Sequence, residues 1–197
     1  MAGEIILITG GARSGKSTYA EERAKELSPN ASDSIVYVAT CIADDEEMHD
    51  RVKKHKERRP QQWKTLEVSE KVGEGIMTYI TNAGSDSLTK GVLLDCITLL
   101  VSQCMANNLT NWEVINPVEA NRVEQVVIDE IESLILASER LSCPFIIVTN
   151  EIGMGLVPEY PAGRLFRDMA GRANQMLARK AKEVILCVSG IPVVIKP

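Results

Sequence analysis

The segment GGARSGKS, residues 10–17, restricts the fold of this chain more than any other short stretch. An apolar run, EIILIT, precedes it, and a helical pattern follows it at about 17–27. The spacing G-x-x-x-x-G-K-[ST] is met in full, by Gly10, Gly15, Lys16 and Ser17. Strand, loop and helix together predict a phosphate-binding loop and disfavour the alternative of a ligand-free strand–helix turn.

Each part of this loop has a chemical purpose. Glycines let backbone N–H groups curve around a phosphate, and the helix N-terminus adds positive potential. Lys16 is the candidate catalytic cation that reaches the outer phosphates, and the Ser17 hydroxyl can ligate Mg²⁺. The whole loop is a candidate nucleotide-binding site: Gly10, Gly11, Ala12, Arg13, Ser14, Gly15, Lys16 and Ser17. The motif alone does not name a reaction.

Two further strand ends carry polar residues. Asp95 closes the apolar run VLLD and is the candidate second ligand for Mg²⁺, the alternative being an Asp that caps the next segment. Asn150 and Glu151 follow another apolar run and lead into a glycine-containing loop. Ligands bind at the carboxyl ends of strands in open α/β sheets, so this loop is either part of the site or an ordinary connection.

The order of apolar and amphipathic segments predicts an α/β fold. Runs without alternation, typical of buried strands, lie at 4–9, 34–40, 91–96, 145–150 and 183–188. Helical patterns lie between them, at about 17–27, 44–58, 68–82, 118–140 and 164–182. We expect a single P-loop NTPase-type domain over residues 1–197, with a mostly parallel sheet flanked by helices. Residues 103–117, rich in Asn, are expected to form an irregular connection.

The end of the chain predicts one exception to the parallel order. Ser189 and Gly190 form a turn signal, and the short run that follows contains Pro192. Proline cannot donate to a strand ladder, so this last strand is expected at the sheet edge and antiparallel to its neighbour.

Composition excludes several classes of protein. A net charge of −5 and a pI near 5.2 disfavour a nucleic-acid binder. No run approaches the roughly 20 apolar residues of a membrane span, and the residues MAGEIILITGG lack the features of a signal peptide. The five cysteines form no C-x-x-C pair, so we expect reduced, mostly buried thiols and a cytoplasmic location.

A basic cluster, RVKKHKERRP at 51–60, stands out in this acidic chain. It carries His55, one of only two histidines, near the C-terminal end of the helix expected at 44–58. Cations suit a helix C-terminus, so a solvated helix end explains the cluster at least as well as a reactive site. Alternatively, a neutral His55 attacks the α-phosphorus of a nucleoside triphosphate, while the cations hold the triphosphate and depress the imidazolium pKa. His49 lies on another helix face and is interpreted as solvated surface.

Several segments together resemble one family along nearly the whole chain. They are ITGGARSGKS, YVAT, DDEEMHDRVKKHKERRPQQWKTLE, LLDCIT, VTNEIGMGLVPE and FRDMAGRANQMLA. The family is the bifunctional adenosylcobinamide kinase/adenosylcobinamide-phosphate guanylyltransferase of cobalamin biosynthesis, and its most specific segment here is R-V-x-x-H-x-x-x-R-P-x-x-W-x-T-x-E. The resemblance implies that a nucleoside triphosphate, ATP or GTP, phosphorylates adenosylcobinamide. GTP then guanylylates a histidine, which passes GMP to the cobinamide phosphate.

The resemblance also implies roles for particular residues. The GMP-carrying histidine corresponds to His55. Nucleotide contacts beyond the phosphate loop correspond to Thr40, Cys41, Ile42, Lys56, Glu57, Arg58, Arg59, Glu67 and Asp95. Either Glu67 or Asp95 could accept hydrogen bonds from guanine, and the sequence leaves both open. Residues 103–117 have no clear counterpart, so no role is transferred to them.

The resemblance further implies a homo-oligomer, possibly a trimer, that acts on small molecules. Two other functions remain open from the residues: a small-molecule kinase that uses the basic segment only as a phosphate clamp, and a nucleotide-dependent regulatory or assembly protein.

Overall fold

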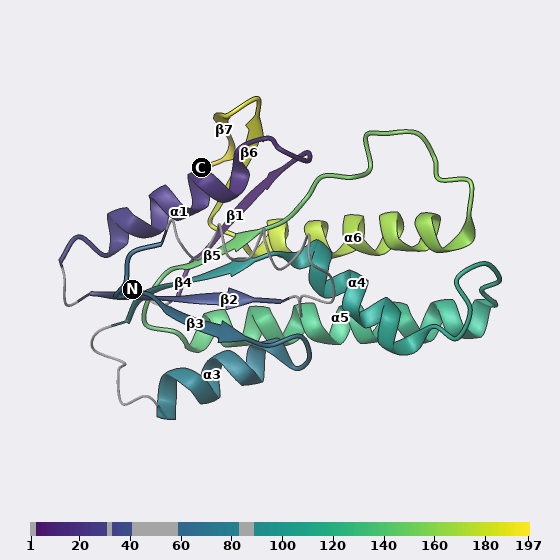
Figure 1. Cartoon of the computed structure of the whole chain (residues 1–197), viewed down its shortest axis with the longest axis horizontal. Helices are drawn as coiled ribbons and strands as arrows, with labels where there is room; N and C mark the ends of the chain where they lie inside the picture. The colour runs from purple at the N-terminus through teal and green to yellow at the C-terminus, as the bar shows by residue number, and fades with distance from the viewer. Residues whose placement is uncertain (1–2, 31–32, 41–58, 83–88) are drawn as a thin grey trace.

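In the part of the chain that the structure describes, seven strands form one sheet in the order β3-β2-β4-β5-β1-β6-β7 (Figure 1). This computed structural model describes residues 3–30, 33–40, 59–82 and 89–197. The strands are β1 (Ile5–Gly10), β2 (Ser34–Ala39), β3 (Lys64–Glu67), β4 (Thr89–Asp95), β5 (Phe145–Val148), β6 (Glu183–Val188) and β7 (Ile191–Lys196). All neighbours are parallel except β6 and β7. The predicted fold class is confirmed, including the antiparallel edge strand.

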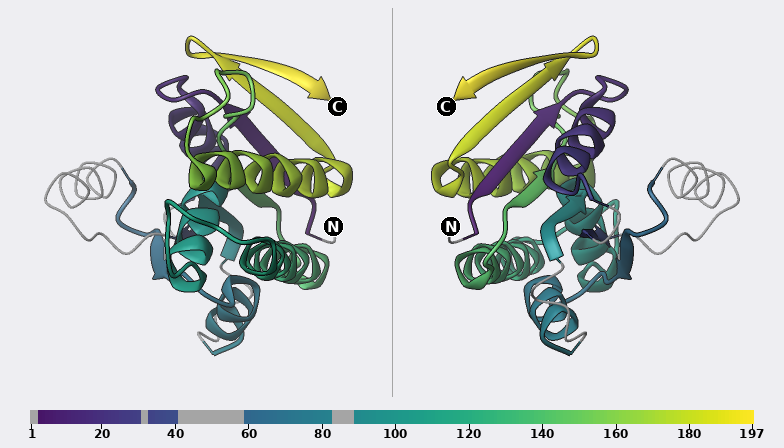
Figure 2. Two further views of the ribbon diagram at one scale, coloured as in Figure 1. Left: turned by 90° about the vertical axis from the view of Figure 1, so that its right-hand side faces the viewer. Right: turned by 90° about the vertical axis from the view of Figure 1, so that its left-hand side faces the viewer.

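Helices cover both faces of this sheet (Figure 2). They are α1 (Lys16–Leu27), α3 (Val72–Asn82), α4 (Ile97–Asn108), α5 (Pro117–Arg140) and α6 (Pro161–Lys180). Among the described helices, α1 packs on one face through Ala20 and Ala24, and the other four pack on the opposite face. The buried residues form two hydrophobic clusters, one on each face of the sheet, because alternate residues of each buried strand point to opposite faces.

Helix α5 shows why the sequence pattern at 118–140 predicted a helix correctly. Asn116 accepts a hydrogen bond from the N–H of Glu119 at 2.9 Å, and Pro117 occupies the first turn. Both features are favoured at helix starts. Val123, Val127 and Ile131 then recur on one side and are buried against the sheet.

Three expectations need correction. Residues 103–108 are helical, as the end of α4, because Cys104 and Met105 are buried in the core and tertiary packing outweighs the asparagines around them. The short edge strand β3 was not predicted, since its residues are mostly exposed and give no apolar run. Helix α3 begins at Val72 rather than at 68, because β3 and its following turn occupy the preceding residues. The helix predicted at 44–58 lies outside the described residues.

A pair of helical glycines tests the packing of this fold. A Cβ on Gly73 would clash with the backbone carbonyl of Ser133, where α3 meets α5, whereas a Cβ on Gly171 in α6 would meet nothing within 4 Å. We expect Gly73→Ala to lower the free energy of unfolding by about 1–3 kcal/mol. The matched change Gly171→Ala should raise it by about 0.5–1 kcal/mol through helix propensity. Denaturant unfolding measures both, and equal effects would contradict the close α3–α5 contact.

Candidate active site

The phosphate loop connects the end of β1 to the start of α1, as the motif predicts. Gly15 has a φ of 90°, a conformation that favours glycine, and it directly precedes the first helical residue, Lys16. A side chain on Gly10 would lie 2.6 Å from the carbonyl oxygen of Cys187 on β6. Both glycines are therefore required by the geometry of the loop.

Lys16 lies over this loop and is largely buried. Its Nζ donates to the carbonyl oxygen of Gly11 at 3.2 Å, and only 9% of the residue is exposed. Burial raises the pKa of the Cys96 thiol, the charge of Asp95 raises it further, and Lys16 lowers it. Lys16 likewise lowers the pKa of Cys187, which burial raises. The ammonium charge therefore acts on the ends of both β4 and β6.

The C-terminal hairpin supports the loop from the side. The N–H of Gly190 donates to the carbonyl oxygen of Ser14 at 2.9 Å. The Cα of Gly190 would lie 3.0 Å from a Cβ on Gly15, so the turn and the loop touch through backbone atoms. The sequence predicted the turn at 189–190 but carries no signal that it would contact the phosphate loop.

The strand register brings two predicted acidic residues to the carboxyl ends of the strands, which we call the strand edge, and to one face of the sheet. Ala39 pairs with Glu67 on β3 and with Asp95 on β4. Asp95 in turn pairs with Val148, and Val148 pairs with Ile8 just before the phosphate loop. Paired residues of parallel strands point to the same face, which here is the face covered by α1. Glu67 and Asp95 thus share the edge that holds Lys16.

Tyr37 joins two of the predicted site residues. The guanidinium carbon of Arg59 lies 3.1 Å from the centroid of the Tyr37 ring. The Tyr37 hydroxyl donates to Oδ2 of Asp95 at 3.4 Å. Burial and the neighbouring Asp95 raise the pKa of the Tyr37 phenol far above its usual range, against the opposing charge of Arg59. The phenol therefore stays protonated and available as a donor to the carboxylate.

A chain of hydrogen bonds runs beneath this edge from β2 to α6. Thr40 donates to the carbonyl oxygen of Cys96 at 2.8 Å, and the Cys96 sulfur lies 3.1 Å from the Thr98 hydroxyl. The Asn150 amide donates to Thr98 at 2.6 Å, and the Asn174 amide donates to the Asn150 carbonyl at 3.0 Å. The Thr40 hydroxyl is buried and is used in this chain of hydrogen bonds, so Thr40 has a structural role here.

The polar residue Glu151, which follows β5, makes hydrogen bonds within the protein. The N–H of Glu151 donates to the carbonyl oxygen of Gly10 at 3.1 Å. Its side chain accepts from the N–H of Gly153 at 3.0 Å. The loop predicted as either site or connection therefore borders the phosphate loop and fixes one end of it.

Sequence reasoning missed several residues of this edge. Tyr37 lies in a predicted strand, Asn174 in a predicted helix and Thr98 in α4, a helix that was not predicted. Their roles depend on contacts between distant segments. Other predicted site residues, Cys41, Ile42, His55, Lys56, Glu57 and Arg58, lie outside the described residues.

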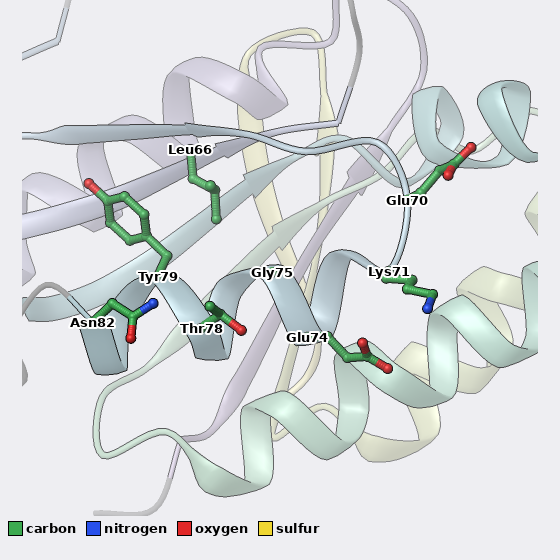
Figure 3. A pocket seen from close by; sticks show the side chains of 8 residues that line it. All are labelled: Leu66, Glu70, Lys71, Glu74, Gly75, Thr78, Tyr79 and Asn82. Atoms are coloured by element: carbon green, nitrogen blue, oxygen red, sulfur yellow. The ribbon is translucent and has the colours of Figure 1, made fainter.

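A cavity of about 660 Å³ lies elsewhere, between β3 and α3 (Figure 3). Leu66 and Tyr79 line it, together with the acidic Glu70 and Glu74. Leu66 neighbours Glu67 on β3 and packs toward the opposite core cluster, so this cavity opens on the other face of the sheet. It is separate from the edge that carries Lys16 and Asp95.

Two properties of the described residues bear on the class of site. Over residues 3–30, 33–40, 59–82 and 89–197, no three His, Cys, Asp or Glu side chains converge to hold a metal by themselves. In the same residues, no helix is long and apolar enough to cross a membrane. The described cysteines, Cys96, Cys104, Cys143 and Cys187, are buried, as predicted.

Similarity to known proteins covers almost the whole chain. The family described as cobinamide kinase / cobinamide phosphate guanyltransferase matches residues 6–195. The chain is 40% identical to a bifunctional adenosylcobalamin biosynthesis protein, CobU, of Escherichia coli strain K12, over 98% of this chain and 99% of that protein. It is also 40% identical to the protein of the same description from Salmonella typhimurium, over the same shares. Identity to the bifunctional adenosylcobalamin biosynthesis protein CobP of Pseudomonas aeruginosa is 34%, over 96% of each chain.

The phosphate loop, the row of carboxylates and the extent of these matches agree with one another, and the chain belongs to the cobinamide kinase / cobinamide phosphate guanyltransferase family.

Proposed function

We propose that this chain, working as one domain, carries both reactions of its family. It phosphorylates the hydroxyl of adenosylcobinamide with a nucleoside triphosphate. It then transfers GMP from GTP to the phosphorylated product through a histidine, which yields adenosylcobinamide-GDP. The family match along residues 6–195 carries this proposal, and the phosphate loop that shares a sheet edge with Asp95 supports it.

The phosphoryl transfer is assigned to the β1 side of the edge. Residues Gly10 to Ser17 hold the phosphates of ATP or GTP, and Lys16 exchanges its contact with Gly11 for the outer phosphates. The Ser17 hydroxyl and the Asp95 carboxylate would hold Mg²⁺. Such hard oxygen donors fit that ion, which commonly takes one or two protein ligands plus phosphate oxygens and water. The bound ion would neutralise charge on the phosphates.

The guanylyl transfer is assigned to His55. Its neutral imidazole nitrogen forms a bond to the α-phosphorus of GTP as the bond to the pyrophosphate oxygen breaks. The terminal phosphate oxygen of cobinamide phosphate next attacks this phosphorus, the P–N bond breaks, and the histidine is released. Cationic residues beside it, Lys56, Arg58 and Arg59, stabilise the leaving pyrophosphate, and Cys41, Ile42 and Glu57 complete the nucleotide contacts.

The register favours separate roles for the two acidic residues. Glu67 lies two strands from Asp95, a separation of roughly 10 Å at the usual spacing between strands. Asp95 stands closer to the phosphate loop and is the better partner for Mg²⁺. Glu67, exposed at the outer strand, is the better acceptor for guanine N1–H and N2–H₂.

Covalent labelling tests the nucleophile. Incubation with α-³²P-GTP and Mg²⁺, followed by denaturation, should leave acid-labile, base-stable label on the wild-type protein, as a phosphoramidate requires. We expect His55→Ala to reduce this label to background, because no other group carries the GMP. The matched control His49→Ala, which removes the other histidine, should keep the label.

The same assay separates the rival functions. A kinase without nucleotidyl transfer would phosphorylate cobinamide but show no label on protein. A nucleotide-dependent regulatory protein would bind or hydrolyse nucleotide without dependence on cobinamide. Label that persists in His55→Ala would refute the assigned nucleophile.

Tyr37 is assigned the role of holding Arg59 and Asp95 in position. The ring carries the Arg59 guanidinium at 3.1 Å, and its hydroxyl contacts Asp95. A cation–π contact on a buried ring is worth about 1–2 kcal/mol, so loss of the ring should raise the KM for GTP by about fivefold to thirtyfold. We expect this in Tyr37→Leu, measured as the concentration dependence of histidine labelling.

Tyr37→Phe keeps the ring and loses only the long hydrogen bond to Asp95, so its KM for GTP should stay within about twofold of the wild type. Tyr19→Leu, at a partly buried tyrosine of α1 that packs against the same core cluster as Tyr37, controls for removal of a tyrosine. If Tyr37→Phe and Tyr37→Leu raise the KM equally, the stacked ring does not position Arg59.

The exposed outer strand supports a homo-oligomer. Along β6 and β7, Val188, Ile191, Val193, Val194 and Ile195 are 46–65% exposed, and no described helix covers them. An apolar strand at a sheet edge favours association with another chain. We propose that β7 joins copies of this enzyme, as a trimer, in the cytoplasm.

Size-exclusion chromatography with light scattering tests the assembly. Val194→Glu places a charge on the outer strand and should shift the mass towards the monomer. Val118→Glu, the same change at a 78% exposed residue of α5, should not. An oligomer that is unaffected by Val194→Glu would place the contact elsewhere.

A further inference from the structure

A second cavity, of about 480 Å³, lies beside the strand edge, and none of the roles above uses it. It is enclosed by α4, the start of α6 and two loops, residues 109–116 and 149–160, which approach the same end of the molecule (Figure 1). Its main walls are aromatic or thioether side chains with two polar residues between them: Met105, Trp112, Tyr160, Phe166, Ser102 and Glu113. We call it the aromatic cavity.

Hydrogen bonds fix the loop that carries Trp112. The Asn111 side chain accepts from the N–H groups of Glu113 at 2.8 Å and Val114 at 3.2 Å. The Thr110 hydroxyl donates to Glu119 on α5 at 2.6 Å. The backbone that carries Trp112 is thus fixed, and 45% of the residue is exposed.

The opposite wall is fixed as well. The Arg164 guanidinium donates to the carbonyl oxygens of Pro158 at 3.2 Å and Glu159 at 2.5 Å. Gly163 lets Pro158 approach closely, since an added Cβ would lie 2.7 Å from the proline ring. Tyr160 therefore keeps its place at the start of α6 with 66% of its surface exposed.

Such an arrangement is typical of a ligand site. Rigid aromatic side chains that face solvent across a preformed hollow leave apolar surface available for a flat partner. Preformed walls also reduce the entropy that binding would otherwise lose. The volume lies within the usual range of small-molecule sites.

The aromatic cavity lies partway along α4, at a distance from Asp95 and therefore from the proposed phosphate site. Helix α4 begins two residues after Asp95, and Ser102 follows Asp95 by seven residues, which corresponds to roughly 10 Å of helix rise. The loop that carries Tyr160 leaves the same edge from β5. A ligand here would lie near the phosphates without touching them.

We propose that the aromatic cavity binds one edge of the corrin macrocycle of the acceptor. This inference rests on the proposed function. The hydroxyl that reacts in cobinamide sits at the end of a flexible arm, so the macrocycle must be held away from the phosphorus while the arm reaches it. The ring is large, flat and positively charged at the metal, which suits the faces of Trp112 and Tyr160 and the carboxylate of Glu113.

Steady-state kinetics of the kinase step tests this site. Trp112→Ala and Tyr160→Ala should each raise the KM for cobinamide by about tenfold, while the KM for the nucleotide stays unchanged. Trp112→Phe should restore most of the affinity. Tyr79→Ala, in the cavity between β3 and α3, is the matched control and should change neither constant.

Histidine labelling by GTP needs no corrinoid, so it should be normal in all four variants and shows that each is folded. Equilibrium dialysis with dicyanocobinamide gives a second measurement and should show the same loss of affinity in the alanine variants. A wild-type enzyme that does not phosphorylate cobinamide would overturn the proposed function itself. An active wild type with unchanged KM in both alanine variants, or a changed oligomeric mass with unchanged KM, would overturn only the aromatic cavity.

Discussion

Backbone contacts from distant segments hold the phosphate loop in shape, and the site depends on them. Glu151 donates to Gly10 at one end of the loop, and Gly190 donates to Ser14 near the other. Both hydrogen bonds have main-chain N–H donors, so their geometry follows from the pairing of β5 and β6 with β1. These contacts preform the loop, which lowers the reorganisation that is needed to surround an anion.

The same strand order explains why the remaining groups converge. Placing β5 between β1 and β4 puts Asp95 two strands from the phosphate loop, and β2 and β3 extend the edge to Glu67. A nucleoside triphosphate is an elongated ligand, so its shape fits a line of strand ends better than a round pocket. The buried chain from Thr40 to Asn174 ties these ends together and keeps their spacing constant.

Prediction from the sequence succeeded where the cause is local. The loop motif, the buried strands and the proline-containing edge strand each follow from neighbouring residues, and all are present in the structure. It failed where contacts between distant segments decide the outcome. Residues 103–108 are helical because Met105 packs in the core. Tyr37 contacts Arg59 and Asp95 only because the fold brings β2, β4 and the residues before β3 together. The register of three strands, which no local pattern encodes, unites Glu67 with Asp95.

Two reactions on one edge do not require two phosphate loops, and the sequence contains one such motif. In the proposed reactions a hydroxyl attacks the γ-phosphorus first and a histidine attacks the α-phosphorus second, so one bound triphosphate would offer both targets. The nucleophiles must then arrive from different sides. Thr40, which follows β2, and Arg59, which precedes β3, are the described residues on either side of the segment that carries His55 in the sequence. The aromatic cavity lies on the α4 and β5 side. The proposed place of the macrocycle on this side leaves the β2 and β3 side to the proposed histidine nucleophile.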